Sequence, residues 1–347
     1  MNSLSYSKIN AYILQSPINR FFVSGFDASL GYVVISENSK TFYTDSRYFL
    51  AAKEKLADFT VKKITGKGAL DTIAKDLLDS GFKAIGFEDN FVSVDSFKTL
   101  KDKFKGLTLK GASSEIDAIR LVKSSQEIAK IKKSQTIAEK AFDEIIDLIK
   151  PGITEREVAT SLNIECLKLG ADEMAFKTIV AFGANSAIPH HVPSDKKLEK
   201  NDLILLDFGV KLDGYHSDMT RTFCLGEPSE KMQEVYDIVL AAQDYALKHI
   251  KAGLTCHEAD SLAREYIRAN GYEAEFSHSL GHGLGLKIHE SPFVRENGED
   301  LLLPGMVISV EPGIYIEGEG GVRIEDIVVV REDGVENLTT TGKNFVL

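Results

Sequence analysis

The sequence has few cysteines, no long apolar run and no excess of basic residues. Its three cysteines, Cys166, Cys224 and Cys256, are odd in number and widely spaced, which predicts neither a disulfide framework nor a cysteine zinc motif. No uninterrupted apolar segment approaches the roughly 20 residues that span a bilayer, and no basic start leads into an apolar core. We therefore expect a cytoplasmic protein in a reducing compartment, without a signal peptide or a membrane partner.

The charge and length of the chain further restrict the classes of protein to which it can belong. A formal net charge of −11 at pH 7 argues against a nucleic-acid partner, because phosphate backbones are bound by basic surfaces. Hydrophobic residues at 43% and charged residues at 27% are ordinary for a globular protein. A chain of 347 residues is long for one ordinary core, so we predict two domains, residues 1–118 and residues 119–347.

The first of these domains alternates apolar runs with helix-like segments. Between residues 19 and 46, the runs NRFFVSGF, GYVVIS and KTFYTDS are separated by turns and predict a meander of strands. Further strands are expected at FTVKKIT, KAIGFE and LTLKGAS, with helices over residues 69–80 and 93–104. Strands that alternate with helices indicate a compact α/β layer domain.

The second domain contains an internal repeat. Residues 150–170, KPGITEREVATSLNIECLKLG, align without gaps with residues 251–271, KAGLTCHEADSLAREYIRANG. Each copy opens with a capping box, a threonine followed three residues later by a glutamate: Thr154 with Glu157, and Thr255 with Glu258. Both copies are therefore expected to begin a helix in the same way.

The repeat continues into the strands that follow these helices. Both LEKNDLILLD, residues 198–207, and LLPGMVISVE, residues 302–311, contain a turn, four mostly apolar residues and then an acid. A second acid comes later in each half, Asp218 in the first and Glu325 in the second. We infer a duplication that places four carboxylates around one shared crevice.

A β-hairpin is predicted around Asp207 and Asp218. The apolar run at 203–206 leads into Asp207, and Asp213-Gly214 favours a tight two-residue turn. With that turn, Asp207 lies opposite Thr220, and both acids project from the same face. Two buried carboxylates aimed at one point need cations between them, and a pair of divalent ions fits this requirement. The alternative is a solvated acidic hairpin without a function.

Histidines gather in two segments of the second domain. The glycine-rich stretch HSLGHGLGLKIHE holds His278, His282 and His289, and its glycines let the backbone approach a ligand closely. In the first half, SAIPHHVPSD supplies His190 and His191. A lone histidine is more often structural than a ligand, whereas this grouping favours a site.

These motifs resemble the pita-bread metallopeptidases. The resemblance implies five metal ligands: Asp207, Asp218, His282, Glu311 and Glu325. The N-terminal domain with TDSRY, together with the PHH and GHGLGLKIHE segments, is similar to the Xaa-Pro exopeptidases aminopeptidase P and prolidase. The implied fold is a creatinase-type α/β domain over residues 1–118, followed by an α+β pita-bread domain over residues 119–347 with a pseudo-two-fold duplication.

The resemblance also implies a cofactor and roles for individual side chains. It implies two divalent ions per subunit, Mn²⁺ in the first place and Co²⁺ or Zn²⁺ as alternatives, which suits carboxylate and imidazole ligands without thiolates. A hydroxide held by the two ions would attack the bond before proline. The implied catalytic residues are His190, His289, Glu311 and Arg323. The implied substrate-binding residues are His190, His289, Tyr315 and His278.

The expected activity is the release of the first residue from peptides that begin Xaa-Pro, as in aminopeptidase P. One alternative is a prolidase that accepts dipeptides only, and an alternative of another class is an inactive pita-bread binding protein. A methionine aminopeptidase shares the ligand set, but the first domain argues against it. The resemblance further implies a homodimer. His191 departs from the glycine common in the family, so its side chain either alters the substrate pocket or points away from it.

Overall fold

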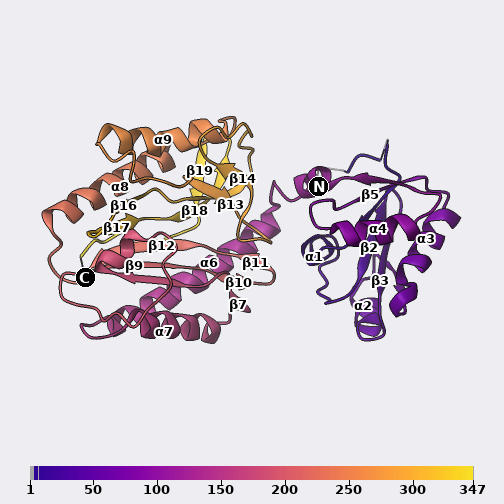
Figure 1. Cartoon of the computed structure of the whole chain (residues 1–347), viewed down its shortest axis with the longest axis horizontal. Helices are drawn as coiled ribbons and strands as arrows, with labels where there is room; N and C mark the ends of the chain where they lie inside the picture. Colours follow the sequence, from indigo (N-terminus) through magenta and orange to yellow (C-terminus); the bar gives the residue numbers. More distant parts are fainter. Residues whose placement is uncertain (1–3, 7, 347) are drawn as a thin grey trace. The chain divides into compact units, whose positions relative to one another are not determined.

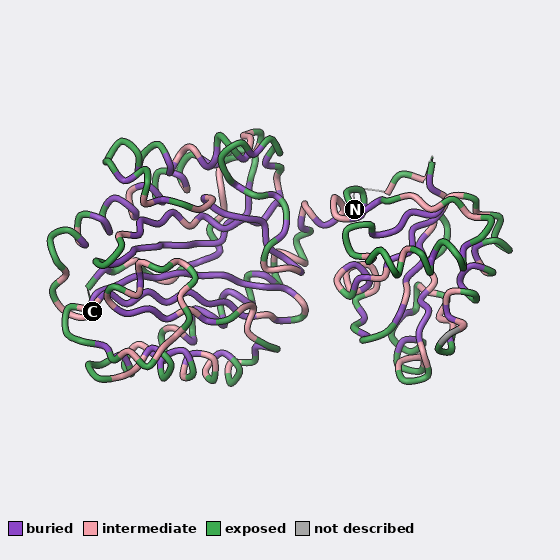
Figure 2. The backbone as a smooth tube through the Cα atoms, in the orientation of Figure 1, coloured by how far each residue is buried: buried purple, intermediate pink, exposed green. Residues whose placement is uncertain are grey.

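The structure, a computed structural model of the chain, describes residues 4–6 and 8–346. The chain divides into two compact units, Met1–Arg120 and Leu121–Leu347. Each unit has its own hydrophobic core, and Figure 2 shows that buried positions concentrate on the strands of both. The boundary proposed at residue 118 lies at the last residue of helix α5 (Ser113–Ala118).

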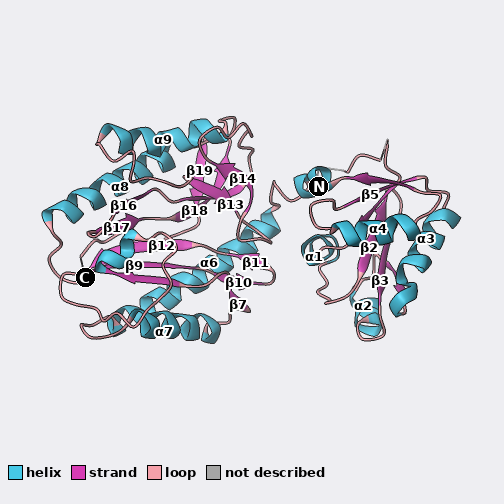
Figure 3. Cartoon of the chain, viewed as in Figure 1, coloured by secondary structure: helices cyan, strands magenta, loops and turns pink. Residues whose placement is uncertain are grey.

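The first unit is an α/β layer structure around one mixed sheet. The strand order is β4-β3-β2-β1-β5-β6, and helices cover both faces (Figure 3). The pairs β1–β2 and β2–β3 are antiparallel, while the outer pairs are parallel. Its elements are β1 (Ala11–Leu14), α1 (Pro17–Ser24), β2 (Tyr32–Ser36), β3 (Lys40–Thr44), α2 (Phe49–Lys55), β4 (Thr60–Lys63), η1 (Gly66–Gly68), α3 (Ala69–Asp79), β5 (Ala84–Phe87), α4 (Val94–Lys103), β6 (Thr108–Gly111) and α5.

One predicted strand of this unit is wrong. The segment NRFFVSGF, residues 19–26, belongs mainly to helix α1 rather than to a strand. The Ser16 side chain caps the helix by accepting a hydrogen bond from the Asn19 backbone, a proline occupies the first turn, and Gly25 ends the helix with φ 64°. The strand in this region is β1 (Ala11–Leu14), which was not expected from the sequence. It is buried on both faces, so its residues do not alternate between apolar and polar.

The second unit is built from two α+β halves. Figure 1 shows α8 and α9 on one outer side and α7 on the other, with the strands between them. The first half comprises α6 (Ser125–Ile145), η2 (Ile146–Leu148), α7 (Glu155–Lys168), β7 (Glu173–Met174), β8 (Ile179–Phe182), η3 (Gly183–Ala187), β9 (Leu203–Phe208), β10 (Val210–Leu212), β11 (Tyr215–His216) and β12 (Met219–Cys224). The second half comprises α8 (Glu230–His249), α9 (Cys256–Ala269), β13 (Gly281–Gly283), β14 (Glu290–Val294), β15 (Val307–Val310), β16 (Gly313–Ile316), β17 (Gly320–Arg323), β18 (Asp326–Arg331) and β19 (Gly334–Asn337).

The described part of the second unit contains four sheets. The first half has three-stranded sheets β12-β9-β8 and β11-β10-β7, and the second half has the five-stranded sheet β14-β13-β15-β18-β19 and the pair β16-β17. Helices α6 and α7 pack on the first half, and α8 and α9 on the second, so each half encloses apolar side chains of its own. Among the described residues, no helix is long and apolar enough to cross a membrane.

The duplication is confirmed by matching backbone hydrogen bonds. The Gly152 N–H donates to the Leu198 carbonyl at 2.8 Å, and the Gly253 N–H donates to the Leu302 carbonyl at 2.9 Å. Both capping boxes are also formed, at the starts of α7 and α9. The two halves therefore share one local architecture, which positions Asp207 and Glu311 at corresponding places.

The predicted hairpin register is confirmed as well. Leu212 pairs with Tyr215, leaving Asp213 and Gly214 as the turn with φ 50° and 82°. A tight turn with two positive φ angles is the primed type that matches strand twist. On the same register, Thr220 pairs with Asp207.

Candidate active site

Two acids of the first half lie on the hairpin between β9 and β12. Asp207 is the fifth residue of β9, and Asp218 directly precedes β12. Both residues are buried, with relative exposures of 9% and 4%. Within the described part of the chain, the Oδ1 atom of each acid has no hydrogen-bond partner. Buried carboxylate oxygens without partners are costly, which indicates that a cation belongs beside them.

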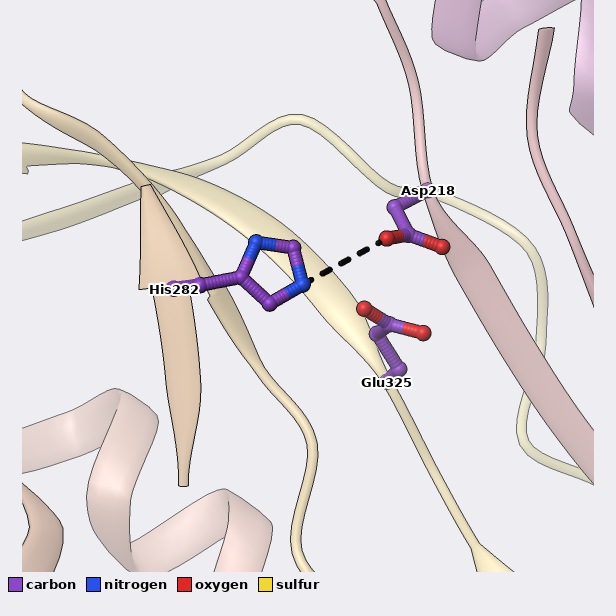
Figure 4. A group of neighbouring side chains, drawn as sticks. All are labelled: Asp218, His282 and Glu325. Atoms are coloured by element: carbon purple, nitrogen blue, oxygen red, sulfur yellow. Dashed lines mark ion pairs between the residues drawn. The ribbon is translucent and has the colours of Figure 1, made fainter. Parts of the chain in front are cut away.

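Three further candidate ligands come from the second half. His282 lies on β13, Glu311 directly follows β15, and Glu325 directly precedes β18. Strands β13, β15 and β18 are neighbours in one sheet, so their ends meet. The His282 Nε2 atom lies 3.4 Å from Glu311 Oε1 and 3.7 Å from Asp218 Oδ2. Figure 4 shows the imidazole directed at the carboxylates of Asp218 and Glu325.

Hydrogen bonds fix which ring nitrogen of His282 faces this cluster. Its Nδ1 atom lies 3.1 Å from the Gly283 carbonyl, which can only accept, so Nδ1 carries the proton. The Nε2 atom then has a free lone pair toward the acids, as a metal-binding imidazole requires. Burial lowers the pKa of His282 and favours this neutral form. Ser309 Oγ accepts from the His282 N–H and donates to Glu311 Oε1 at 2.9 Å.

The electrostatics of the cluster are unfavourable without positive charge. Burial, followed by repulsion from neighbouring acids, raises the pKa of Asp218 and of Glu325 well above the usual range. Burial also raises the pKa of Glu311 to about 7. One ligand atom each from Asp218, His282 and Glu325 lies within 4.8 Å of the others. The donor set, the unpartnered oxygens and the burial fit hard or borderline divalent cations.

Arg323 holds two of the acids in position through hydrogen bonds. Its Nη2 atom donates to Asp207 Oδ2 at 2.5 Å, and its Nε atom donates to Thr220 Oγ1 at 3.2 Å. Thr220 in turn donates to Glu325 Oε2 at 2.7 Å. The guanidinium therefore orients one carboxylate directly and a second one through a hydroxyl group, which leaves the other oxygens directed at the centre.

Tyr315 and His278 extend this hydrogen-bond chain. Arg323 Nη1 donates to the Tyr315 hydroxyl at 2.7 Å, and the Tyr315 oxygen lies 2.9 Å from His278 Nε2. His278 Nδ1 lies 2.8 Å from the Ser279 carbonyl, so it donates there and Nε2 accepts from tyrosine. Burial and the nearby arginine lower the pKa of His278 to about 4. Among the described residues, His278 lines the cavity in front of the acids, whereas Tyr315 lies behind Arg323.

A cavity of about 540 Å³ opens in front of the acid cluster. His190 and His289 both line it, and the His289 ring packs edge-on against His282 at 4.3 Å between centroids. Partial burial lowers the pKa of His289, which favours a neutral ring able to donate one hydrogen bond. The apolar part of the wall is formed by Phe176, Ile179, Pro189, Val192 and Phe293.

The loop that carries His190 is held by a buried carboxylate at the start of α7. Glu155 has no exposed surface. It accepts hydrogen bonds from Phe182 N, Asn185 Nδ2, Ser194 N and Ser194 Oγ at 2.6–2.9 Å. His191 Nε2 also lies 2.8 Å from Glu155 Oε2. The His191 side chain therefore reaches the edge of the cavity but is directed at Glu155.

Some residues around the cavity were not anticipated from the sequence. Phe176 and Lys177 fall in no motif. Glu155 lies within the repeat at residues 150–170, but nothing in the sequence marks it as a site residue. Thr220 could have been identified, because the hairpin register already placed it opposite Asp207. Nine of the ten predicted site residues line the cavity. The tenth, Tyr315, contacts the site through its hydrogen bond with Arg323.

Family models match both units of the chain. Residues 129–332 match the model described as metallopeptidase family M24. Residues 2–122 match the model described as the creatinase/prolidase N-terminal domain. The two matches together span nearly the whole chain.

Similar proteins also extend over both units. The Xaa-Pro dipeptidase of Pyrococcus horikoshii is 39% identical over 341 residues, which are 98% of this chain and 95% of that protein. A structure described as an Xaa-Pro dipeptidase from Bacillus anthracis is 40% identical, with a TM-score of 0.94, over 98% of this chain and 95% of that one. A structure described as an X-Pro aminopeptidase from Thermotoga maritima is 41% identical, with a TM-score of 0.93, over 98% of each chain. This chain therefore belongs to metallopeptidase family M24, a family of metal-dependent hydrolases, and its pita-bread domain follows a creatinase/prolidase N-terminal domain.

Proposed function

We propose that this protein is an Xaa-Pro dipeptidase, which hydrolyses the bond between the first residue and proline in dipeptides. The observation that carries the proposal is the convergence of four acids and one imidazole, from both halves of the second unit, beside one cavity of about 540 Å³. The similarity to the Xaa-Pro dipeptidases of Pyrococcus horikoshii and Bacillus anthracis supports dipeptides as substrates. It favours this alternative over the longer peptides that the sequence analysis put first.

The residues that would hold two divalent ions are those of the acid cluster: Asp207, Asp218, His282, Glu311 and Glu325. When bound, such ions neutralise the buried acids, polarise a peptide carbonyl and lower the pKa of water to near neutrality. We propose Mn²⁺ in the first place, with Co²⁺ and Zn²⁺ as alternatives, because oxygen and imidazole ligands suit all three.

The chain's own side chains then bind and orient the substrate. We propose that His190 and His289, which both line the cavity, donate hydrogen bonds to the substrate carbonyl and to the oxyanion that develops there. We propose that Glu311, which lines the cavity beside His282, also moves a proton to the leaving nitrogen. Arg323 keeps Asp207 in place, and the chain through Tyr315 and His278 keeps Arg323 in place.

Proline explains why a dedicated site is needed. In an Xaa-Pro bond the nitrogen carries no hydrogen, and the ring fixes φ, so an enzyme that binds an N–H or a different backbone shape fails there. The apolar side chains of Phe176, Ile179 and Phe293 provide a wall against which a pyrrolidine ring can pack. A cavity of about 540 Å³ is large enough to enclose a dipeptide.

The second candidate is an Xaa-Pro aminopeptidase that acts on longer peptides. The Thermotoga maritima structure carries that description and is as similar to this chain as the dipeptidases are. The test measures hydrolysis of Ala-Pro and of Ala-Pro-Ala with Mn²⁺, Co²⁺ or Zn²⁺ added to metal-free protein. We expect Ala-Pro to have the higher kcat/KM. A preference for Ala-Pro-Ala assigns the second function, and no hydrolysis of either peptide with any of the metals excludes both.

We also propose a homodimer, as the family resemblance implies. Sedimentation velocity of the metal-loaded protein measures this directly. A single species with the mass of one chain, 38.2 kDa, at all concentrations contradicts the proposal.

A further inference from the structure

Among the described residues, one lysine and one arginine line the cavity, Lys177 and Arg323. Arg323 is fully engaged, because it donates to Asp207, Thr220 and the Tyr315 hydroxyl. Lys177 is exposed and makes no hydrogen bond or ion pair with any residue that the structure describes. It is thus a cation that lines the cavity and forms no ion pair with the described residues.

The backbone directs Lys177 toward the cavity through an irregular strand connection. Strand β7 pairs Met174 with Val210, while β8 pairs Ile179 with Asp207. The four residues 175–178 therefore face only the two residues 208–209 on the partner strand. Such bulges bend a strand and re-aim its side chains, often beside active sites. The bulge brings Phe176 and Lys177 to the cavity wall next to Ile179, which lies on the same face as Asp207.

The chemistry of a dipeptide requires a cation at such a place. In Xaa-Pro the terminal carboxylate lies only two bonds beyond the proline nitrogen, roughly 3 Å from the carbonyl carbon that is attacked. A carboxylate this close to the reacting bond enters a cavity lined by aromatic rings and four other acids. Removal of this carboxylate from water is costly unless a positive group pairs with it. A longer peptide has a neutral amide at this position.

We propose that Lys177 binds the terminal carboxylate of the dipeptide and so determines the preference for dipeptides. The proposal rests on the proposed function and goes further, because it names the group that binds the terminal carboxylate of the substrate. Lysine is suited to this role, since its ammonium group is a compact charge on a flexible stem, and Lys177 lines the same cavity as Phe176 and Phe293.

Another cation nearby provides a matched control. The Arg295 guanidinium lies 6.0 Å from the centre of the Phe293 ring, but Arg295 lines a different pocket together with Arg264 and Arg268. Arg295→Gln removes one positive charge close to the site, as Lys177→Gln does, without removing a side chain that lines the cavity.

The experiment compares the full-length wild-type protein, Lys177→Gln, Lys177→Glu and Arg295→Gln, all loaded with Mn²⁺. The substrates are Ala-Pro as the free acid and Ala-Pro amide, which lacks the terminal charge. We expect Lys177→Gln to raise KM for Ala-Pro by about 10-fold or more, as for loss of a charge-assisted hydrogen bond, with kcat changed by less than about 3-fold. Lys177→Glu should raise KM further. For the amide, wild type and Lys177→Gln should have equal KM values, and Arg295→Gln should match wild type on both substrates.

The outcomes separate this proposal from the proposed function. If wild type hydrolyses neither substrate, the proposed function itself is wrong. If wild type hydrolyses Ala-Pro and Lys177→Gln leaves its KM unchanged, or raises KM equally for acid and amide, Lys177 does not bind the carboxylate. Equal metal content and equal circular dichroism spectra of the variants exclude a loss of folding as the cause.

Discussion

Among single residues, Asp218 shows most directly how burial prepares the site for cations. Its carboxylate is buried, its Oδ1 atom has no partner among the described residues, and Asp207 and Glu311 repel it. Such a group is stable as an anion only when a positive charge lies beside it. The same reasoning applies to Glu325, which comes from the other half of the domain.

The first prediction concerns a variant that lacks the Asp218 carboxylate. Asp218→Ala should lower kcat on Ala-Pro by at least about 1,000-fold and reduce the content of bound divalent metal, because a proposed ligand of the ions is lost. Elemental analysis after dialysis and steady-state kinetics measure both effects. Asp237→Ala, which removes an exposed acid on α8, is the control and should match wild type. Full turnover by Asp218→Ala would show that the ligand assignment is wrong.

The second prediction concerns His278 and pH. The pKa of this histidine is lowered from 6.5 to about 4 in the folded protein, so between these values the unfolded chain binds more protons. Its contribution to stability is complete above pH 6.5 and is lost as the pH falls toward 4, on the order of 3 kcal/mol over the window.

The contribution of His278 to the pH dependence of stability can be isolated with a variant whose side chain at this position does not titrate. His278→Gln keeps an acceptor for Tyr315 and a donor for the Ser279 carbonyl, so its free energy of unfolding in urea should fall less than that of wild type between pH 6.5 and pH 4. His249→Gln, at an exposed position of α8, should retain the wild-type slope. Parallel curves for His278→Gln and wild type contradict the lowered pKa.

At the scale of elements, the same capping interaction occurs at the start of two helices, α7 and α9. Thr154 and Thr255 each accept a hydrogen bond from the backbone N–H three residues later, at the starts of α7 and α9. We predict that Thr154→Ala and Thr255→Ala each lower the free energy of unfolding by about 1 kcal/mol. Urea denaturation measures this. Thr136→Ala, at an exposed position inside α6, should change stability by less than about 0.5 kcal/mol, and equal losses for all three variants contradict a specific role of the caps.

The loop from η3 to residue 194 is held by one buried group, the Glu155 carboxylate. Glu155 accepts from backbone and side-chain donors of this loop on both of its oxygens. Glutamine in its place turns one acceptor into an NH₂ group that faces donors. We predict that Glu155→Gln lowers kcat by about 10-fold or more through displacement of His190, with unchanged metal content.

A glutamate two residues further along the same helix is the matched control. Glu157→Gln preserves the capping box, since glutamine serves equally at that position, and should leave kcat unchanged. Wild-type kcat in Glu155→Gln, or equal losses in both variants, shows that the loop is not positioned by Glu155. Loss of metal from Glu155→Gln assigns the effect to the acid cluster instead.

At the scale of the whole molecule, all the proposed metal ligands belong to the second unit, while each unit encloses its own apolar core. Metal binding stabilises only the unit that contains the site. We predict that added Mn²⁺ raises the unfolding temperature of residues 121–347 and leaves that of residues 1–120 unchanged. Differential scanning calorimetry with and without EDTA, combined with hydrogen exchange to assign each transition, measures this. Equal protection of both units by the metal is the contrary result.

Several features of this protein follow from sequence-local physics alone. A threonine with a glutamate three residues later starts α7 and α9, and Asp213-Gly214 fixes the hairpin register and with it the pairing of Asp207 with Thr220. These predictions succeeded because the interactions join residues close together in the chain. The prediction of a strand at residues 19–26 was wrong, although the signals there are also local. The Ser16 cap and Gly25 favour a helix and outweigh the apolar run.

The amino-acid sequence by itself determined the two related halves, the hairpin and the set of acids and histidines available for a site. Only the tertiary structure decided which of them meet: Asp218 and His282 are far apart in the chain, and neighbouring strands bring them to within 3.7 Å. It also decided that His191 is directed at Glu155, and that Lys177 lines the cavity. The physical reason is that sheet pairing and burial act between segments distant in sequence, and no local pattern encodes where a bulge will aim a side chain.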